Sequence, residues 1–167
     1  MIICTTTRTY LREFTLDDAP FMYQLNSNPE VLKYTGDKAF ENEAAARTFL
    51  ENYDQYKKYG LGRWALMDNT THQFMGWCGL KYNPTSNEYD IGFRLFQTYW
   101  NKGYASEAAQ ACLDWGFKRP DIQVILGRAM ADNIGSIKVL EKIGLQYYKA
   151  FDFDGQAGVI YRIEKTS

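Results

Sequence analysis

Short runs in which apolar and polar residues alternate recur along most of this chain, and clusters of turn residues separate them. Alternation with a period of two is typical of half-buried strands, because successive side chains of a strand point to opposite faces. The pattern predicts seven strands, over residues 7–14, 63–68, 73–82, 88–95, 123–130, 145–153 and 159–164. We expect Asp154 and Gly155 to turn the last two strands into a hairpin.

Apolar residues at intervals of three and four predict helices between these strands. Residues that favour helix ends support the assignment: Thr15 and Asp18 can form a capping box, Asn28 and Asn133 can cap helices, and Gly60 can end one. The expected helices span residues 16–26, 28–35, 42–59, 105–117 and 133–144, with a loop at 36–40.

The helix predicted over 105–117 lies between two predicted strands, 88–95 and 123–130. A crossover of this length favours parallel pairing of the two strands, whereas the tight turns elsewhere favour antiparallel pairing. The sequence therefore predicts one domain over residues 1–167, of the α/β (α+β) class. Its sheet should be mixed but largely antiparallel, with about four principal helices.

Composition narrows the range of ligands. With 167 residues, 46% of them apolar, the chain can bury a substantial core. A formal net charge of −1, without a basic run of five or more, argues against nucleic acid as a partner. No segment approaches the ~20 apolar residues of a membrane span, and we expect a cytoplasmic protein with no membrane contact. Cys4, Cys78 and Cys112 fit reduced thiols in a core better than disulfides or a zinc site, so no metal is expected.

The most informative segment is WNKGYASEA, at residues 100–108. It joins a predicted strand to a predicted alanine-rich helix through a lysine, a glycine and small residues. The free N–H groups and the positive dipole end of a helix start bind anions, and a glycine lets an anion approach the backbone. We therefore expect this turn to cradle the phosphate groups of a polyanionic cofactor.

Three segments in this order resemble the GNAT superfamily of acyl-CoA-dependent N-acyltransferases: DIGF at 90–93, WNKGYASEA at 100–108 and NxxSxxVLEKIG at 133–144. The resemblance is closest to the RimJ/RimL-like branch, the ribosomal-protein N-terminal acetyltransferases, and extends over nearly the whole chain. It implies a sheet splayed between the fourth and fifth predicted strands, with coenzyme A in the splay. It also implies transfer of an acetyl group from acetyl-CoA to a primary amine of a peptide or a small molecule.

The pyrophosphate-binding signature of the family, Arg/Gln-x-x-Gly-x-Gly/Ala, is matched here at both small positions, whereas Trp100 replaces the first residue. The resemblance further implies strand-like hydrogen bonds between the pantetheine arm and residues 94–96, and a contact from Asn133 on the other side. The expected cofactor-binding residues are Arg94, Leu95, Phe96, Asn101, Lys102, Gly103, Tyr104, Ala105, Ser106, Asn133 and Ser136.

Acyl transfer requires an uncharged amine, a donor to the developing oxyanion and protonation of the leaving thiolate. Strand alternation places Asp90 and Glu88 on one face, and either could act as the base; Asp90 has the acidic position that the branch places before Ile-Gly. A backbone N–H near residues 93–95 is the expected oxyanion donor. Many family members protonate the thiolate with a tyrosine, but Leu140 stands at that position, and the branch places Ser136 at a position proposed for the role.

The acceptor can be narrowed by the shortage of bases, since the only histidine, His72, is expected in a surface turn. Roughly a quarter of α-amines, with a pKa of ~7.7–8.0, are neutral near pH 7.4, against about one lysine in a thousand. A weak base therefore suffices only for an α-amine or another amine of low pKa, which we expect as the acceptor. The protein is expected to be a monomer or a homodimer.

Simpler interpretations stay open for individual residues. Asp90 and Glu88 fit solvated strand charges, Ser136 fits an ordinary first-turn residue, and Asn133 fits a plain helix cap that can also contact a cofactor. The alternative function is a coenzyme A sensor or interaction module without transferase activity, which Leu140 at the tyrosine position supports. A dinucleotide-binding enzyme and a P-loop NTPase are excluded because their glycine motifs are absent.

Overall fold

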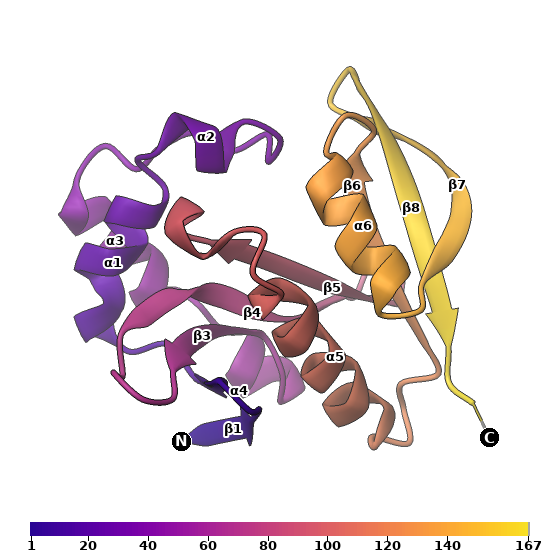
Figure 1. Ribbon diagram of the computed structural model, residues 1–167, viewed down its shortest axis with the longest axis horizontal. Coiled ribbons are helices and arrows are strands. Elements are labelled where there is room, and N and C mark those ends of the chain that lie inside the picture. Colours follow the sequence, from indigo (N-terminus) through magenta and orange to yellow (C-terminus); the bar gives the residue numbers. More distant parts are fainter. Residues whose placement is uncertain (167) are drawn as a thin grey trace.

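The computed structural model describes residues 1–166 and contains, within them, one eight-stranded sheet in the order β1-β2-β3-β4-β5-β6-β8-β7 (Figure 1). All neighbouring strands pair antiparallel except β5 and β6, which pair parallel. The strands are β1 (Ile2–Thr5), β2 (Thr9–Arg12), β3 (Arg63–Asp68), β4 (Phe74–Asn83), β5 (Glu88–Leu95), β6 (Val124–Met130), β7 (Gln146–Phe153) and β8 (Gln156–Glu164). The mixed, largely antiparallel sheet is confirmed.

The predicted number of strands, seven, is wrong because the N-terminus forms a hairpin. The single strand expected over 7–14 is only its second half, and β1 pairs with it across a turn in which the Thr6 N–H donates to the Thr9 carbonyl at 2.8 Å. β1 lies at the edge of the sheet and both of its end residues are exposed. A short edge strand of this kind needs no strict alternation of apolar and polar residues, so its pattern gave no signal.

The described residues form six α-helices rather than about four, although two of the six are short. They are α1 (Ala19–Leu25), α2 (Pro29–Leu32), α3 (Glu43–Glu51), α4 (Gln55–Tyr59), α5 (Tyr104–Phe117) and α6 (Ile134–Lys142), with 3₁₀ turns η1 (Leu16–Asp18) and η2 (Gln97–Tyr99). The helix expected over 42–59 is divided, since Asn52 ends α3 and Asp54 begins α4. Asn and Asp compete with the helix for backbone hydrogen bonds and favour its ends, which explains the break.

Helices cover both faces of the sheet and give two buried clusters. The alternating residues of β3 show this division, because Trp64 and Leu66 belong to the cluster under α5 whereas Ala65 and Met67 pack against α1 and α3. Cys78 and Cys112 are buried in the first cluster, as predicted, while Cys4 is half-buried. Within residues 1–166, no helix has the length and apolar character needed to cross a membrane.

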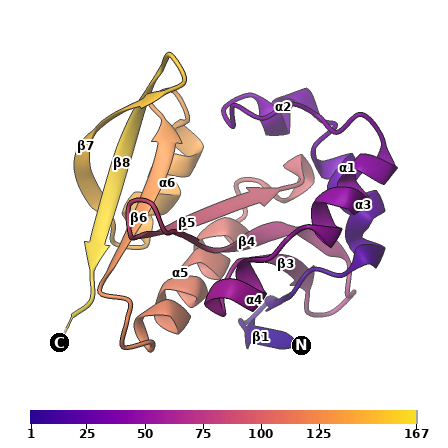
Figure 2. The same cartoon turned by 180° about the vertical axis from the view of Figure 1, so that it is seen from behind.

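The sheet splays where the resemblance implies. Parallel pairing between β5 and β6 is limited to Asp90 with Leu126 and Ile91 with Gly127, although β5 stays paired with β4 as far as Leu95. Beyond these two pairs β5 and β6 diverge, as Figure 2 shows. β6 continues into the antiparallel unit of β6, β8 and β7 instead. One edge of β5 is therefore left open toward the C-terminal part of the molecule.

Candidate active site

The turn before α5 has the backbone conformation of an anion cradle. Gly103 is the N-cap of α5 in the left-handed region, with φ of 83°, and Asn101 has a φ of 60°. The first hydrogen bond of the helix runs from the Glu107 N–H to the Gly103 carbonyl at 3.0 Å. The N–H groups of residues 104–106 precede that bond and therefore face outward for other acceptors. A diphosphate fits this arrangement, because a helix start offers N–H donors and a positive dipole end.

Arg8 borders the cradle, although no local sequence pattern marks it as a site residue. Its guanidinium group donates to the Lys102 carbonyl at 3.0 Å and to a carboxylate oxygen of Glu107 at 2.9 Å, and it lies 4.0 Å from the centroid of the Tyr104 ring. A Cβ at Gly103 would lie 3.3 Å from the same guanidinium group. A positive charge is thus fixed beside the turn by contacts across almost one hundred residues of sequence.

Trp100, the departure from the family signature, has a structural role. Its indole N–H donates to the Leu95 carbonyl at 2.9 Å, which ties the cradle turn to the end of β5. The Phe96 N–H donates to the Met75 carbonyl at 3.0 Å and therefore points toward β4. Because backbone groups of successive strand residues point to opposite edges, those of Leu95 and Phe93 point to the open edge of β5. Of the backbone groups expected to bind pantetheine, the Phe96 N–H is already occupied, and the carbonyls of Leu95 and Phe96 already accept from Trp100 and Tyr99.

The Arg94 side chain faces away from the cradle. Its two terminal nitrogens donate to the Asn26 amide oxygen at 2.6 Å and to the Asp37 carboxylate at 2.7 Å, and the group stacks near Trp77. Arg94 thus connects β5 to the loop expected at 36–40. By the same alternation its backbone N–H and carbonyl point toward Trp77 of β4, so the hydrogen bond expected from Arg94 to pantetheine is not available at the open edge.

Asn133 and Ser136 come together at the N-terminus of α6, across the splay from β5. The Asn133 side chain accepts from the Ser136 N–H at 3.2 Å and donates to the Ser136 hydroxyl oxygen at 3.0 Å. Asn133 is therefore a helix cap, and the hydroxyl proton of Ser136 stays available to another acceptor. Leu140 is buried against β6, where a Cβ at Gly127 would lie 2.6 Å from it, so a core residue occupies the tyrosine position.

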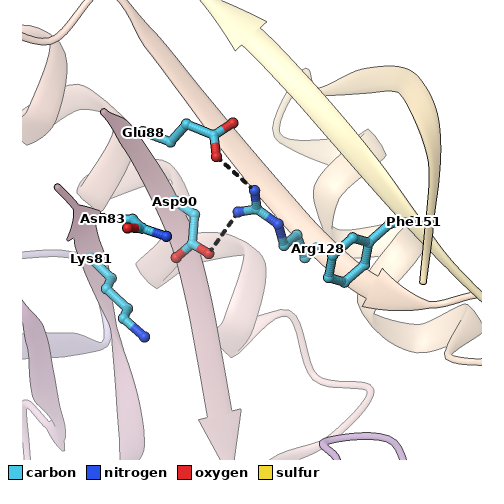
Figure 3. Close-up of a pocket in the computed structure, with 6 residues that line it drawn as sticks. All are labelled: Lys81, Asn83, Glu88, Asp90, Arg128 and Phe151. Atoms are coloured by element: carbon cyan, nitrogen blue, oxygen red, sulfur yellow. Dashed lines mark hydrogen bonds and ion pairs between the residues drawn. The ribbon is translucent and has the colours of Figure 1, made fainter. Parts of the chain in front are cut away.

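Asp90 and Glu88 lie together in a cavity of about 300 Å³ at the closed end of the splay (Figure 3). Arg128 of β6 bridges them, with nitrogen–oxygen distances of 3.0 Å to Glu88 and 3.4 Å to Asp90, and Arg63 of β3 contacts Asp90 at 2.8 Å. The interpretation as solvated strand charges is therefore wrong. Arg128 interrupts an apolar strand in the sequence, and a charge in such a strand needs a counter-ion; this signal could have predicted the pairing.

The pKa of Glu88 reflects this network. Burial acts to raise it, but hydrogen bonds from Ser86 and Arg128 and the charges of Arg128 and Lys149 outweigh burial and hold it below its usual value. A carboxylate that holds protons this weakly is a weak base. His72 offers no alternative, because it lies in the exposed turn after β3, as predicted, where it contacts the Tyr10 hydroxyl at 3.0 Å.

A sheet that splays after a short parallel stretch, with an anion-binding helix start beside the splay, defines an acyltransferase of the GNAT class. Residues 8–146 match the family described as acetyltransferase (GNAT) domain. The chain belongs to this family and is an acetyltransferase.

Relatives and solved structures agree with this assignment. The chain is 34% identical over 143 residues to YnaD of Bacillus subtilis (strain 168), named as an uncharacterized N-acetyltransferase, covering 85% of this chain and 81% of that protein. A GNAT-family acetyltransferase from Bacillus anthracis superposes with a TM-score of 0.84 at 28% identity, covering 99% of both chains. RimL, the ribosomal L7/L12 α-N-protein acetyltransferase, in complex with coenzyme A, has the same fold, with a TM-score of 0.84 at 16% identity over 98% of both chains.

Proposed function

We propose that this chain, as a single domain over residues 1–167, transfers an acetyl group from acetyl-CoA to a primary amine, either a protein N-terminal α-amine or a small-molecule amine. The observation that carries the proposal is the open edge of β5 beyond Ile91, which has the cradle at Gly103 on one side and the N-terminus of α6 on the other. Acetyl-CoA supplies the thioester whose acyl group is transferred.

In this proposal each part of the donor molecule has its own binding groups. The diphosphate is held by the N–H groups of residues 103–106, with the side chains of Asn101 and Lys102 beside them. The pantetheine arm follows the open edge at Leu95, with Asn133 and Ser136 on the opposite side, and passes Arg94 without a backbone hydrogen bond, since the Arg94 backbone groups point toward β4. Phe96 contributes no free backbone group, because its N–H donates to the Met75 carbonyl and its carbonyl accepts from the Tyr99 N–H at 2.9 Å.

The proposed chemistry uses both sides of the splay. A backbone N–H at Phe93 or Leu95, directed to the open edge, donates to the oxyanion that develops on the acyl carbonyl. Asp90, or Glu88 in its place, accepts the amine proton through water. The Ser136 hydroxyl, which accepts from Asn133, donates its own proton to the departing thiolate. The proton on Ser136 is then restored from solvent.

Because the site offers carboxylates and no histidine as bases, we expect an acceptor amine that is partly neutral at neutral pH. An α-amine meets this condition, since roughly a quarter of such groups are uncharged near pH 7.4. The name of RimL describes transfer to a protein α-amine, and its fold matches this chain closely. We therefore propose the RimJ/RimL-like branch for this chain.

The test is the release of free thiol from acetyl-CoA in the presence of N-terminal peptides, polyamines or aminoglycosides. We expect saturable release with at least one α-amine at neutral pH, and a mass increase of one acetyl group on that amine. Tight binding of coenzyme A without transfer to any amine would favour the sensor function instead. Fast transfer to lysine side chains alone would contradict the α-amine acceptor.

A further inference from the structure

The charged cavity at the closed end of the splay is lined by residues from strands on both sides of the splay (Figure 3). Its lining residues are Lys81 and Asn83 of β4, Glu88 and Asp90 of β5, Arg128 of β6 and Phe151 of β7. A molecule bound in this cavity would lie next to the residues proposed to handle the acceptor. The charge balance of the cavity therefore bears on which amines can be accepted.

Both carboxylates of the cavity are already neutralised by arginines. Arg63 pairs with one oxygen of Asp90, and Arg128 pairs with the other and with Glu88. The four side chains are only 18–32% exposed. A polycationic substrate would have to displace a guanidinium group and leave a half-buried charge without its partner, which is strongly unfavourable. The cavity is therefore poorly suited to polyamines.

Lys81 adds a positive charge that nothing in the cavity balances. It lies directly opposite Asp90 in the pairing of β4 with β5, so both side chains are on the same face of the sheet. Lys81 forms no ion pair with any side chain of residues 1–166. Three cations, on Lys81, Arg63 and Arg128, thus accompany two carboxylates. One cation is therefore available to an anionic ligand.

We propose that the acceptor is an amine that also carries a carboxylate, and that Lys81 binds this carboxylate while the amine reaches the open edge of β5. The proposal rests on the acetyltransferase function proposed above and adds the substrate class. A strand rises ~3.4 Å per residue, so Phe93 lies about 10 Å along β5 from Asp90, the cross-strand neighbour of Lys81. Amine and carboxylate are therefore separated by up to about 10 Å. An acidic side chain in the first or second residue of a peptide fits this separation, and so does the side-chain carboxylate of a free amino acid.

The test compares acceptors that differ only in charge. C-terminally amidated peptides beginning Ala-Glu, Ala-Gln and Ala-Lys, together with free glutamate and spermidine, are assayed by thiol release with the wild-type protein. We expect kcat/KM for Ala-Glu to exceed that for Ala-Gln by about three- to fivefold, the range of a partly exposed ion pair, and to exceed that for Ala-Lys and spermidine by more. The preference should shrink in high salt, because exposed charges are screened.

Lys81→Gln should bring the ratio of kcat/KM for Ala-Glu to that for Ala-Gln close to one. Lys81→Glu should reverse the charge preference, so that kcat/KM for Ala-Lys exceeds that for Ala-Glu. Lys118→Gln removes the same charge from an exposed position at the end of α5 and is the matched control, with an unchanged ratio. A higher kcat/KM for free glutamate than for the peptides would show that the acceptor is a small amino acid. A higher kcat/KM for Ala-Glu than for free glutamate would show that the acceptor is a peptide. Equal rates for the three peptides without a higher rate for free glutamate, a preference for spermidine, or an unchanged ratio in Lys81→Gln would overturn the proposed substrate class. Absence of transfer to every amine would instead overturn the proposed function.

Discussion

Glu107 accepts hydrogen bonds from both the backbone N–H and the side chain of Arg8, at 3.0 and 2.9 Å. The Thr6 hydroxyl donates to the same carboxylate at 2.6 Å. Glu107 is in the first turn of α5, whereas Arg8 and Thr6 belong to the turn of the N-terminal hairpin. This contact anchors the edge of the sheet to the helix that carries the cradle.

The contact predicts a loss of stability in acid. Burial acts to raise the pKa of Glu107, but hydrogen bonds from Thr6 and Arg8 and the charge of Arg8 outweigh it, so the folded-state pKa lies below its usual value. The resulting stabilisation is fully present above the unfolded-state pKa of ~4.3 and is lost as the pH falls through the folded-state pKa. We expect Glu107→Gln to lower the free energy of unfolding by about 1–2 kcal/mol at pH 7.

Urea unfolding at several pH values measures this effect. The difference between wild type and Glu107→Gln should start to shrink near pH ~4.3, where the unfolded-state carboxylate becomes protonated, and should be lost once the pH is below the lower folded-state pKa. Glu51→Gln is the control, because Glu51 forms only an exposed pair with Arg47 and should change stability little. A Glu107→Gln difference that is independent of pH would show that the charge of Glu107 does not contribute.

Replacing Gly103 should weaken cofactor binding. Gly103→Val forces a β-branched residue into a left-handed conformation and places a side chain where a diphosphate approaches the backbone. We expect the Kd for coenzyme A to rise at least tenfold, about 1.4 kcal/mol, as measured by calorimetry. Gly155→Val is the matched control, since Gly155 has a similar φ of 89° in the β7–β8 turn, with no atom within 4 Å of its Cβ position. Equal Kd values for Gly103→Val and wild type would contradict the cradle.

The elements that could be predicted from the sequence are those with a strong local pattern. The turn at Asp154 and Gly155 is one, since both residues have the positive φ of a two-residue hairpin, and the parallel pairing of β5 with β6 followed from the length of the crossover. The division of the helix over 42–59 was missed, because Tyr53 and Tyr56 continue the apolar spacing through the break. Their hydroxyl groups bond to the backbone of residues 63 and 14, contacts that no local pattern encodes.

The residues of the candidate site that could be predicted are likewise those marked by a local sequence pattern. Gly103 could be found because a helix start and a glycine are adjacent in the sequence, and Asn133 and Ser136 because their capping contact is local. Arg8 and Arg128 were missed because their carboxylate partners are distant in sequence. Arg8 is 99 residues from Glu107, and Arg128 is 40 residues from Glu88. The pairing of Arg128 changes the interpretation of the carboxylates, which are members of an ion-pair network rather than free bases.

The choice between the two carboxylates can be tested by isosteric variants. If Asp90 relays the amine proton, Asp90→Asn should lower kcat on the order of 10²-fold, while the Kd for coenzyme A stays near the wild-type value. Asp90→Asn also leaves Arg63 and part of Arg128 without a counter-ion, so the melting temperature must be measured alongside. Glu88→Gln is the comparison, and we expect a smaller decrease in kcat. If only Glu88→Gln lowers kcat to this extent, Glu88 is the base.

The role of Ser136 as proton donor can be tested separately from its role in the cap of α6, because the cap hydrogen bond uses the Ser136 N–H and not its hydroxyl group. In Ser136→Ala the Asn133 side chain can still accept from the residue 136 N–H, so α6 and the fold should be retained. Loss of the hydroxyl should lower kcat by roughly tenfold or more with acetyl-CoA, since a positioned proton donor contributes ~10²-fold or more and water can replace part of it. Ser136→Thr, which keeps a hydroxyl, should recover part of the rate. Wild-type kcat in Ser136→Ala would assign Ser136 to the helix cap alone and leave the thiolate to depart without a protein donor.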